Sequence, residues 1–67
     1  MRHLLKSNGS NKHAVTVHMH EGRSLAFYAM DVRIEDGWLI LTHSKGDSDF
    51  FTTHIPEVTI ARIDIKH

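Results

Sequence analysis

The sequence predicts a small all-β domain, an antiparallel meander of five or six strands that is curled into a barrel or half-barrel. Three observations indicate this fold class. Beyond residue 12, apolar and polar residues alternate, β-branched and aromatic residues are enriched, and turn formers interrupt the pattern at short intervals. Because the chain has 67 residues, we expect a single domain that spans residues 1–67.

The first elements differ in how clearly the sequence defines them. Residues 1–12 are expected to be flexible or to form a short covering segment, in which residues 2–6 fit either a strand or a helical turn. The first clear strand spans residues 13–20, because apolar and polar positions alternate along it. Glu21-Gly22 then fits a two-residue turn.

A long second strand is expected over residues 23–35 and a third strand over residues 38–44. The two residues between them, Asp36-Gly37, are among the strongest hairpin signals, because both tolerate the positive φ angles of a type I′ turn.

The second half of the chain predicts two further strands. A loop at residues 45–48 leads to a strand over residues 49–55, and Pro56 ends that strand because proline has no N–H for a ladder. In the last segment, residues 58–66, the alternation changes phase, and a turn or bulge near Ile60 would account for the change.

The expected turns fix the hairpin registers and sort the side chains onto two faces, because directly opposed residues share a face. Two-residue turns at 21–22 and 36–37 and a four-residue tip at 45–48 give two sets. The face expected to form the core carries Val15, Val17, Met19, Ala26, Tyr28, Met30, Val32, Ile34, Leu39, Leu41, His43, Phe50, Thr52 and His54. The second face carries Thr16, His18, His20, Leu25, Phe27, Ala29, Asp31, Arg33, Glu35, Trp38, Ile40, Thr42, Phe51, Thr53 and Ile55.

Both faces carry large apolar side chains, so both need covering. Closure of the barrel, the N-terminal segment through Leu4 and Leu5, or another protein would cover the second face. The order of the strands resembles that of the Sm-like and SH3-like small barrels. This resemblance is one of architecture alone, and it implies a small closed barrel.

Composition limits the classes of protein to which the chain can belong. A domain of this size has a thin core, and without cysteine it has neither disulfides nor thiolate metal sites, which leaves oligomerisation or a histidine-based metal as a source of stability. Eight basic and eight acidic residues cancel, which disfavours nucleic acid as the partner. No apolar run has the length of a signal peptide or membrane helix, so we expect a cytoplasmic protein with no membrane partner.

The second face holds the residues that we expect at an interface with a protein partner or a second copy. Trp38 directly follows a tight turn on this face, and aromatic and arginine side chains are enriched at the centres of interfaces. Closure of the barrel over Trp38 is the alternative. The expected interface residues are Leu25, Phe27, Arg33, Trp38, Ile40 and Phe51.

Two histidines on one strand face, His18 and His20, have the spacing of a metal pair. Zinc needs three or four ligands, and the other ligands would have to come from Glu21, His3, His67 or another subunit. We therefore favour an exposed polar face or an interface rim at this strand, and we expect no metal and no other cofactor.

His43 and His54 flank a loop, residues 46–49, that contains serine and aspartate. These residue types can form a base, a nucleophile and an orienting carboxylate, but they are common and their proximity in sequence means little. We expect the two histidines to be partly buried and hydrogen-bonded at the mouth of the barrel, and we expect no catalytic residue.

The sequence is therefore interpreted as a small non-enzymatic binding module that acts by protein–protein contact and takes no small-molecule substrate. We expect a homo-oligomeric accessory or inhibitor protein of the kind that small viral and bacterial genomes encode. One alternative is an oligomeric small-barrel protein that binds RNA or DNA through Arg23, Arg33 and Lys45. The other is a metal-binding protein that uses His18 and His20.

Overall fold

The computed structural model describes residues 2–6, 11–46 and 49–66, and for residues 2–6 it describes the backbone only. Within these ranges the chain is all-β, as the sequence predicts. The elements in chain order are β1 (Arg2–Lys6), β2 (His13–Met19), β3 (Ser24–Ala29), β4 (Asp31–Glu35), β5 (Trp38–Lys45), β6 (Asp49–Pro56), a 3₁₀ turn η1 (Glu57–Thr59) and β7 (Ile60–Lys66).

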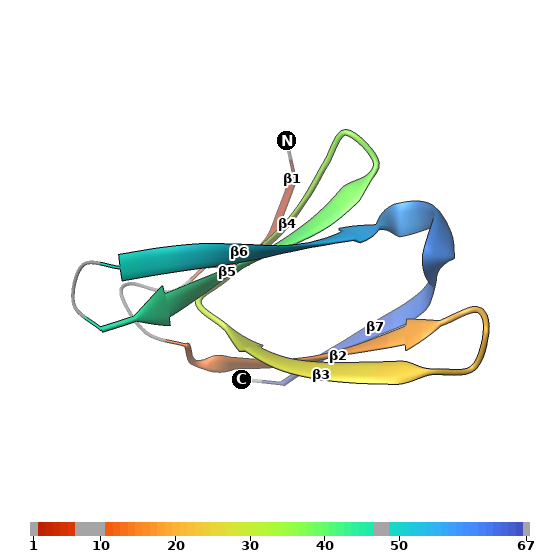
Figure 1. Cartoon of the computed structure of the whole chain (residues 1–67), viewed down its shortest axis with the longest axis horizontal. Helices are drawn as coiled ribbons and strands as arrows, with labels where there is room; N and C mark the ends of the chain where they lie inside the picture. The colour runs from red at the N-terminus through yellow and green to blue at the C-terminus, as the bar shows by residue number, and fades with distance from the viewer. Residues whose placement is uncertain (1, 7–10, 47–48, 67) are drawn as a thin grey trace.

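The strands form two antiparallel sheets that pack face to face. The first sheet has the order β1-β4-β5-β6 and the second has the order β3-β2-β7. Figure 1 shows the two sheets lying one above the other. The closed barrel is not found among the described residues, because the strands are divided between two sheets.

The long strand expected over residues 23–35 is divided at Met30. β3 ends one residue before it in the second sheet, and β4 begins one residue after it in the first sheet. The Met30 N–H donates to the carbonyl of Thr42 at 2.8 Å, so the chain leaves β2 and joins β5 within one residue. The break at Met30 therefore moves the chain from one sheet to the other and does not curl a single sheet.

The hairpin between β4 and β5 has the predicted register. Asp36 and Gly37 have φ angles of 52° and 81°, as a type I′ turn requires, and Glu35 pairs with Trp38. Because the predicted length of this turn is correct, Val32 and the other alternate residues of β4 and β5 lie on the expected face.

The hairpin between β2 and β3 differs from the prediction by one residue. The two-residue turn would pair His18 with Leu25, whereas Val17 pairs with Leu25. The turn has three residues and ends at Gly22, whose φ of 106° suits glycine. A one-residue slip exchanges the two faces of a strand. Phe27 therefore points toward the core, and Tyr28 is 70% exposed.

The hairpin between β5 and β6 is shifted by one residue as well. The four-residue tip would pair His43 with Phe50, whereas His43 pairs with Phe51 and Lys45 pairs with Asp49. The tip therefore has three residues. The slip places Ile55 in the core, although it was expected on the second face. It also exposes three residues that were expected in the core: Phe50, Thr52 and His54.

The core lies between the facing sides of the two sheets, which we call the inner faces. Its buried residues are Val15, Val17, Ala29, Val32, Leu39, Leu41 and Ile55. All except Ala29 and Ile55 were expected there, and these two lie on the strands whose registers slipped. Each fully buried valine or leucine side chain stabilises the fold by about 1.5–3 kcal/mol, and the core has only five of them, so it is thin.

The two ends of the chain complete the sheets. β1 is a strand, which decides between the strand and the helical turn, and its backbone pairs with β4 at a sheet edge and does not lie across a face. The phase change near Ile60 is confirmed: η1 precedes this residue, and the β2–β7 pairing skips Ala61 in a bulge. Residues 7–10, part of the segment 1–12 that was expected to be flexible or covering, lie outside the described residues.

Candidate interaction surface

Each sheet ends in two edge strands, and the four edges lie on two sides of the molecule. β6 and β3 lie on the side toward the viewer in Figure 1, and β1 and β7 lie on the far side. We call these the β3–β6 side and the β1–β7 side. An edge strand presents unpaired N–H and C=O groups that can template a further strand, so the protection of each edge matters.

The edges of the β1–β7 side carry the features that normally prevent strand pairing. β1 begins with Arg2 and ends with Lys6, and its pairing with β4 contains a register shift. β7 has alternating charges at Arg62, Asp64 and Lys66, and its pairing with β2 contains the bulge. Charged side chains and bulges make an edge a poor template.

The edges of the β3–β6 side lack these features. β3 has no charged residue, and β6 has none between Asp49 and Pro56. The described pairs of β3 with β2 and of β6 with β5 run without a register shift. Both strands are rich in aromatic and β-branched residues, which favour strand pairing.

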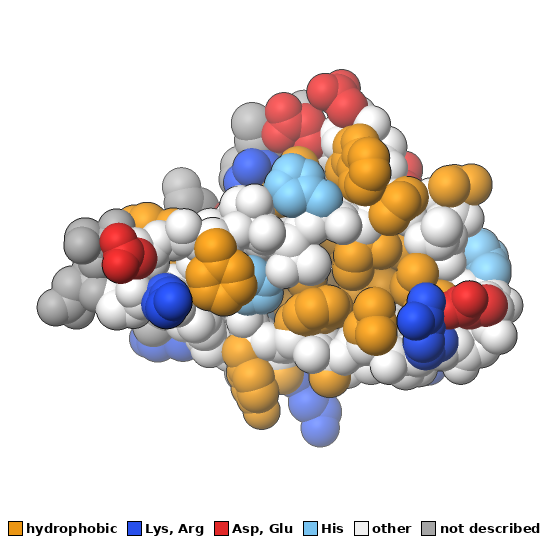
Figure 2. Space-filling model, in the orientation of Figure 1, with side chains coloured by type: hydrophobic (Ala, Val, Ile, Leu, Met, Phe, Trp, Pro, Cys, Tyr) orange, Lys and Arg blue, Asp and Glu red, His pale blue; other side chains and the backbone are white. Residues whose placement is uncertain are grey.

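Hydrophobic side chains are exposed along this side. Phe50 and Phe51 are 56% and 52% exposed, and Tyr28 lies on the outer face of β3. Figure 2 shows hydrophobic side chains gathered between the two sheets on the side where β6 and β3 lie. Phe27 and Met19 pack against the core and are partly buried. A contiguous apolar surface of this kind is typical of an interaction site.

A buried histidine holds the two edges in place. His43 is 5% exposed, and its Nδ1–H donates to the Tyr28 carbonyl at 2.7 Å, because a carbonyl only accepts. Its Nε2 therefore accepts the Thr53 hydroxyl at 2.9 Å. The ring of Phe51 stacks on His43 with centroids 4.7 Å apart and an interplanar angle of 24°. The imidazole thus links β5 to β3 and β6 and supports the exposed Phe51.

The two histidines that flank the β5–β6 tip do not lie together. Both ring nitrogens of His43 are engaged on the inner face, whereas His54 lies on the outer face beside Thr52, with Nε2 to Oγ1 at 3.0 Å. The expectation of a buried, hydrogen-bonded residue is confirmed for His43 and is wrong for His54. Of the loop residues considered for catalysis, Asp47 and Ser48 lie outside the described residues, and Asp49 is exposed at the start of β6.

The six residues expected at one interface are divided between two surfaces. Leu25, Phe27 and Phe51 turn to the inner faces at the β3–β6 side, because of the two register slips. Trp38 and Ile40 stay on the outer face of the first sheet, where Trp38 is 42% exposed and packs edge-on to His54, whereas Ile40 is buried. The sixth residue, Arg33, lies on that outer face too.

The basic residues considered for nucleic-acid binding are dispersed. Arg33 lies 3.2 Å from Asp31 and 3.4 Å from Glu35, so its charge is balanced within its own strand. Arg23 pairs with Glu21 at the β2–β3 turn. Lys45 lies at the β5–β6 tip, at the opposite end of the molecule in Figure 1. These side chains do not form one basic patch.

His18 takes part in a polar ladder across the outer face of the second sheet. Its Nδ1 lies 2.9 Å from Ser24 Oγ on β3, and its Nε2 lies 2.7 Å from Asp64 Oδ2 on β7. The hydrogen bond from His18 and the charge of Arg62 hold the pKa of Asp64 below its usual range. The ladder resembles a serine–histidine–aspartate set, but the cavity described below does not include Ser24. We interpret it as a structural link that joins β3, β2 and β7 through hydrogen bonds.

His20 does not join His18 in a metal site. It lies beyond the end of β2, where its backbone N–H donates to the Thr59 carbonyl at 3.0 Å. Within the described ranges, no three histidine, cysteine, aspartate or glutamate side chains lie close enough together to hold a metal ion.

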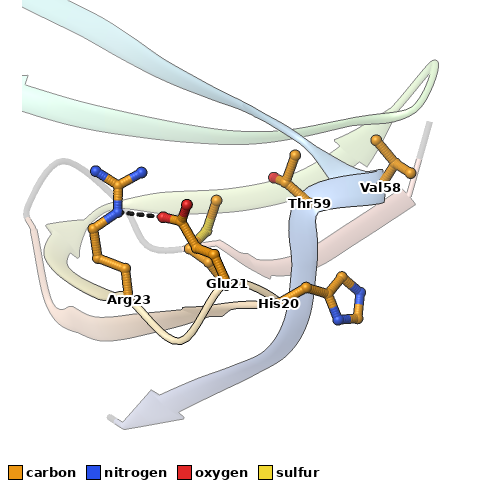
Figure 3. A pocket seen from close by; sticks show the side chains of 6 residues that line it. His20, Glu21, Arg23, Val58 and Thr59 are labelled. Carbon is orange, nitrogen blue, oxygen red and sulfur yellow. Dashed lines mark hydrogen bonds and ion pairs between the residues drawn. The ribbon is translucent and has the colours of Figure 1, made fainter.

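A shallow cavity of about 290 Å³ lies where the β2–β3 turn meets η1. In Figure 3, the Arg23–Glu21 ion pair stands at one side of it, and the His20 ring points away from that pair. Met19, Val58 and Thr59 complete the lining. No cluster of reactive groups converges there: the described lining carries one ion pair, and Val58 is 83% exposed.

No family model matches the chain, and no curated protein or solved structure is significantly similar to it. No helix among the described residues is long and apolar enough to cross a membrane. The contrast between the protected and unprotected edges was missed at the sequence level, although the uncharged run Phe50–Ile55 was its visible signal. This run lies at a sheet edge only because the strands are divided into two sheets, and the sequence did not indicate that division.

Proposed function

We propose that the protein is a non-enzymatic binding module that works by protein–protein contact, and that it self-associates through its β3–β6 side. The observation that carries this proposal is the grouping of both unprotected edges on the side that exposes Phe50 and Phe51. Within this proposal it is a cytoplasmic accessory or inhibitor protein, a role suggested by its size and by the dispersal of its reactive side chains.

Two physical terms support contact at this side. A strand added to an open edge gains main-chain hydrogen bonds, and the side chains on the two faces of the edge provide specificity. Exposed aromatic side chains contribute a large share of the binding energy when an interface covers them. For a chain of 67 residues with a thin core, association also adds buried apolar surface that the monomer lacks.

Neither alternative function has an observation in its favour. The arginines considered for nucleic-acid binding, Arg23 and Arg33, have carboxylate partners, and Lys45 lies far from Arg23. His18 has both ring nitrogens engaged by Ser24 and Asp64. We therefore propose neither a nucleic-acid-binding nor a metal-binding function.

The test is the native mass of the untagged chain, compared with that of Phe50→Lys and Val58→Lys. Both sites are exposed, but Phe50 lies on the β6 edge and Val58 lies on η1. We expect a discrete oligomer for the wild type and for Val58→Lys, and the 7.7 kDa monomer for Phe50→Lys, because a lysine on the edge disfavours pairing. A monomeric wild type, or an oligomer unaffected by Phe50→Lys, would contradict the proposal.

A further inference from the structure

We infer that β6 pairs with β6 of a second copy, antiparallel and across a two-fold axis at Thr52, which joins the two first sheets into one continuous sheet. This inference rests on the proposed function and adds the strand, the partner and the register. It follows from the direction of the backbone N–H and C=O groups of β6, from the partial occupation of the β3 edge, and from the sequence of β6.

The backbone groups that β6 offers at its edge can be identified. The Glu57 N–H donates to the Gly37 carbonyl at 2.8 Å, in the same register that pairs β6 with β5. Backbone groups of successive residues point to opposite sides of a strand in an antiparallel ladder. Odd-numbered residues of β6 therefore bond to β5. The N–H and C=O groups of Phe50, Thr52 and His54 point away from the sheet.

The competing edge on the same side, β3, is partly occupied. The Met19 N–H donates to the Arg23 carbonyl, so odd-numbered residues of β3 bond to β2, and Tyr28 belongs to the outward set. The Tyr28 carbonyl already accepts the Nδ1–H of His43. β3 is also shorter, with six residues against eight. Among the described residues, no such bond reaches the outward backbone groups of Phe50, Thr52 or His54.

The sequence of β6 is self-complementary about Thr52. Directly opposed residues share a face, so an axis at Thr52 keeps the inner faces of the two copies on the same side. It sets Phe50 opposite His54 of the second copy, and cross-strand aromatic pairs are favourable. It pairs residues 49–55 and leaves out Pro56, which has no N–H to donate.

Charge also favours a second copy as the occupant. The eight basic and eight acidic residues cancel, so two copies do not repel each other at pH 7. Along the paired segment, the ionisable side chains are Asp49 at one end and His54 near the other. Between Asp49 and Pro56 the β6 edge has no lysine, arginine, aspartate or glutamate, and β6 of a second copy supplies a matching edge of equal length.

Disulfide trapping tests the inference cleanly, because the natural chain has no cysteine. Directly opposed Cα atoms in a hydrogen-bonded antiparallel pair are about 5.5 Å apart, within the range for a disulfide. Under mild oxidation we expect Thr52→Cys to form a covalent dimer at least tenfold faster than Tyr28→Cys, an exposed control on the outer face of β3. A mixture of Phe50→Cys and His54→Cys should form mainly the mixed disulfide. Circular dichroism confirms that each variant is folded.

Each outcome decides the inference. Fast trapping at Thr52 and a mixed Phe50–His54 disulfide support it. An oligomer by native mass in which Thr52→Cys reacts no faster than Tyr28→Cys overturns the β6 pairing but leaves the proposed self-association standing. A wild type that is monomeric at every concentration overturns both.

Discussion

The two sides of this sandwich differ in whether their edge strands carry features that prevent pairing with a further strand. On the β1–β7 side, the edge strands carry charges and register shifts, and Arg62 and Asp64 also form an ion pair with N–O distance 3.2 Å. On the β3–β6 side, the described pairings contain no register shift, β3 has no charged residue and β6 has its carboxylate at one end, at Asp49. Phe50 and Phe51 are exposed there. Under the proposed function, this difference keeps the β1–β7 side solvated and leaves the β3–β6 side for contact.

The largest expected effect on stability distinguishes β6 residues whose N–H groups bond to β5 from those whose N–H groups point outward. Thr53→Pro removes an N–H that bonds to β5 and the hydroxyl bonded to His43, so we expect a loss of about 2–4 kcal/mol in unfolding free energy. That corresponds to a fall in Tm of roughly 10 °C or more in a domain of this size. Thr52→Pro removes an outward N–H and the exposed contact between Thr52 Oγ1 and His54 Nε2, but no bond to β5, so the fold should persist while the oligomer dissociates.

Thermal unfolding and native mass measured on this matched pair check the assignment. Equal destabilisation by Thr52→Pro and Thr53→Pro would mean that the alternation along β6 is misassigned. An intact oligomer in Thr52→Pro would mean that the β6 edge is not used.

The His43 link between the edges should have the next largest effect. His43→Leu places an apolar side chain of similar size under Phe51 but removes both hydrogen bonds, to the Tyr28 carbonyl and the Thr53 hydroxyl, at a cost of about 1–3 kcal/mol. A double-mutant cycle with Thr53→Val, followed by denaturant unfolding, isolates the second bond. Strict additivity of the two substitutions would show that this hydrogen bond does not couple β5 to β6.

The smallest effect concerns the β1–β7 side and depends on pH. The His18 hydrogen bond and the Arg62 charge lower the pKa of Asp64 below 3.8 in the folded chain. The carboxylate therefore stabilises the fold above pH 3.8, and this contribution is lost as the pH falls through the lowered pKa. Asp64→Asn should be slightly less stable than the wild type at pH 6, and the difference should shrink toward pH 2.

Urea unfolding of both proteins at several pH values measures this difference. Thr16→Asn, a substitution on the same outer face opposite Asp64, serves as the control that adds an amide without removing a charge. A stability difference between Asp64→Asn and the wild type that stays constant from pH 6 to pH 2 would show that the ladder does not depend on the carboxylate charge.

The parts of the fold that could be predicted are those that local sequence determines. Asp36-Gly37 specifies its turn because both residues adopt positive φ, and the phase change near Ile60 marks the bulge in β7. Glu21-Gly22 and the β5–β6 tip specify their lengths less strongly. Both became three-residue turns, and each one-residue difference exchanged the faces of a strand.

The candidate site was only partly predictable for the same reason. The slips moved Phe27 and Phe51 to the inner faces and left Trp38 on an outer face, so the expected interface was divided. The break at Met30 is determined by tertiary structure, because the residues before it pair in one sheet and the residues after it pair in the other. Apolar residues occur at both parities on either side of it, so alternation alone does not reveal it.

Residue-resolved amide hydrogen exchange on β6, measured across protein concentrations, tests the central claim most directly. If β6 is the contact edge, the amides of Phe50, Thr52 and His54 are protected at high concentration and become exchangeable on dilution, while those of Phe51, Thr53 and Ile55 stay protected throughout. Rapid exchange at Phe50, Thr52 and His54 at every concentration, in a protein whose native mass shows an oligomer, would contradict the account.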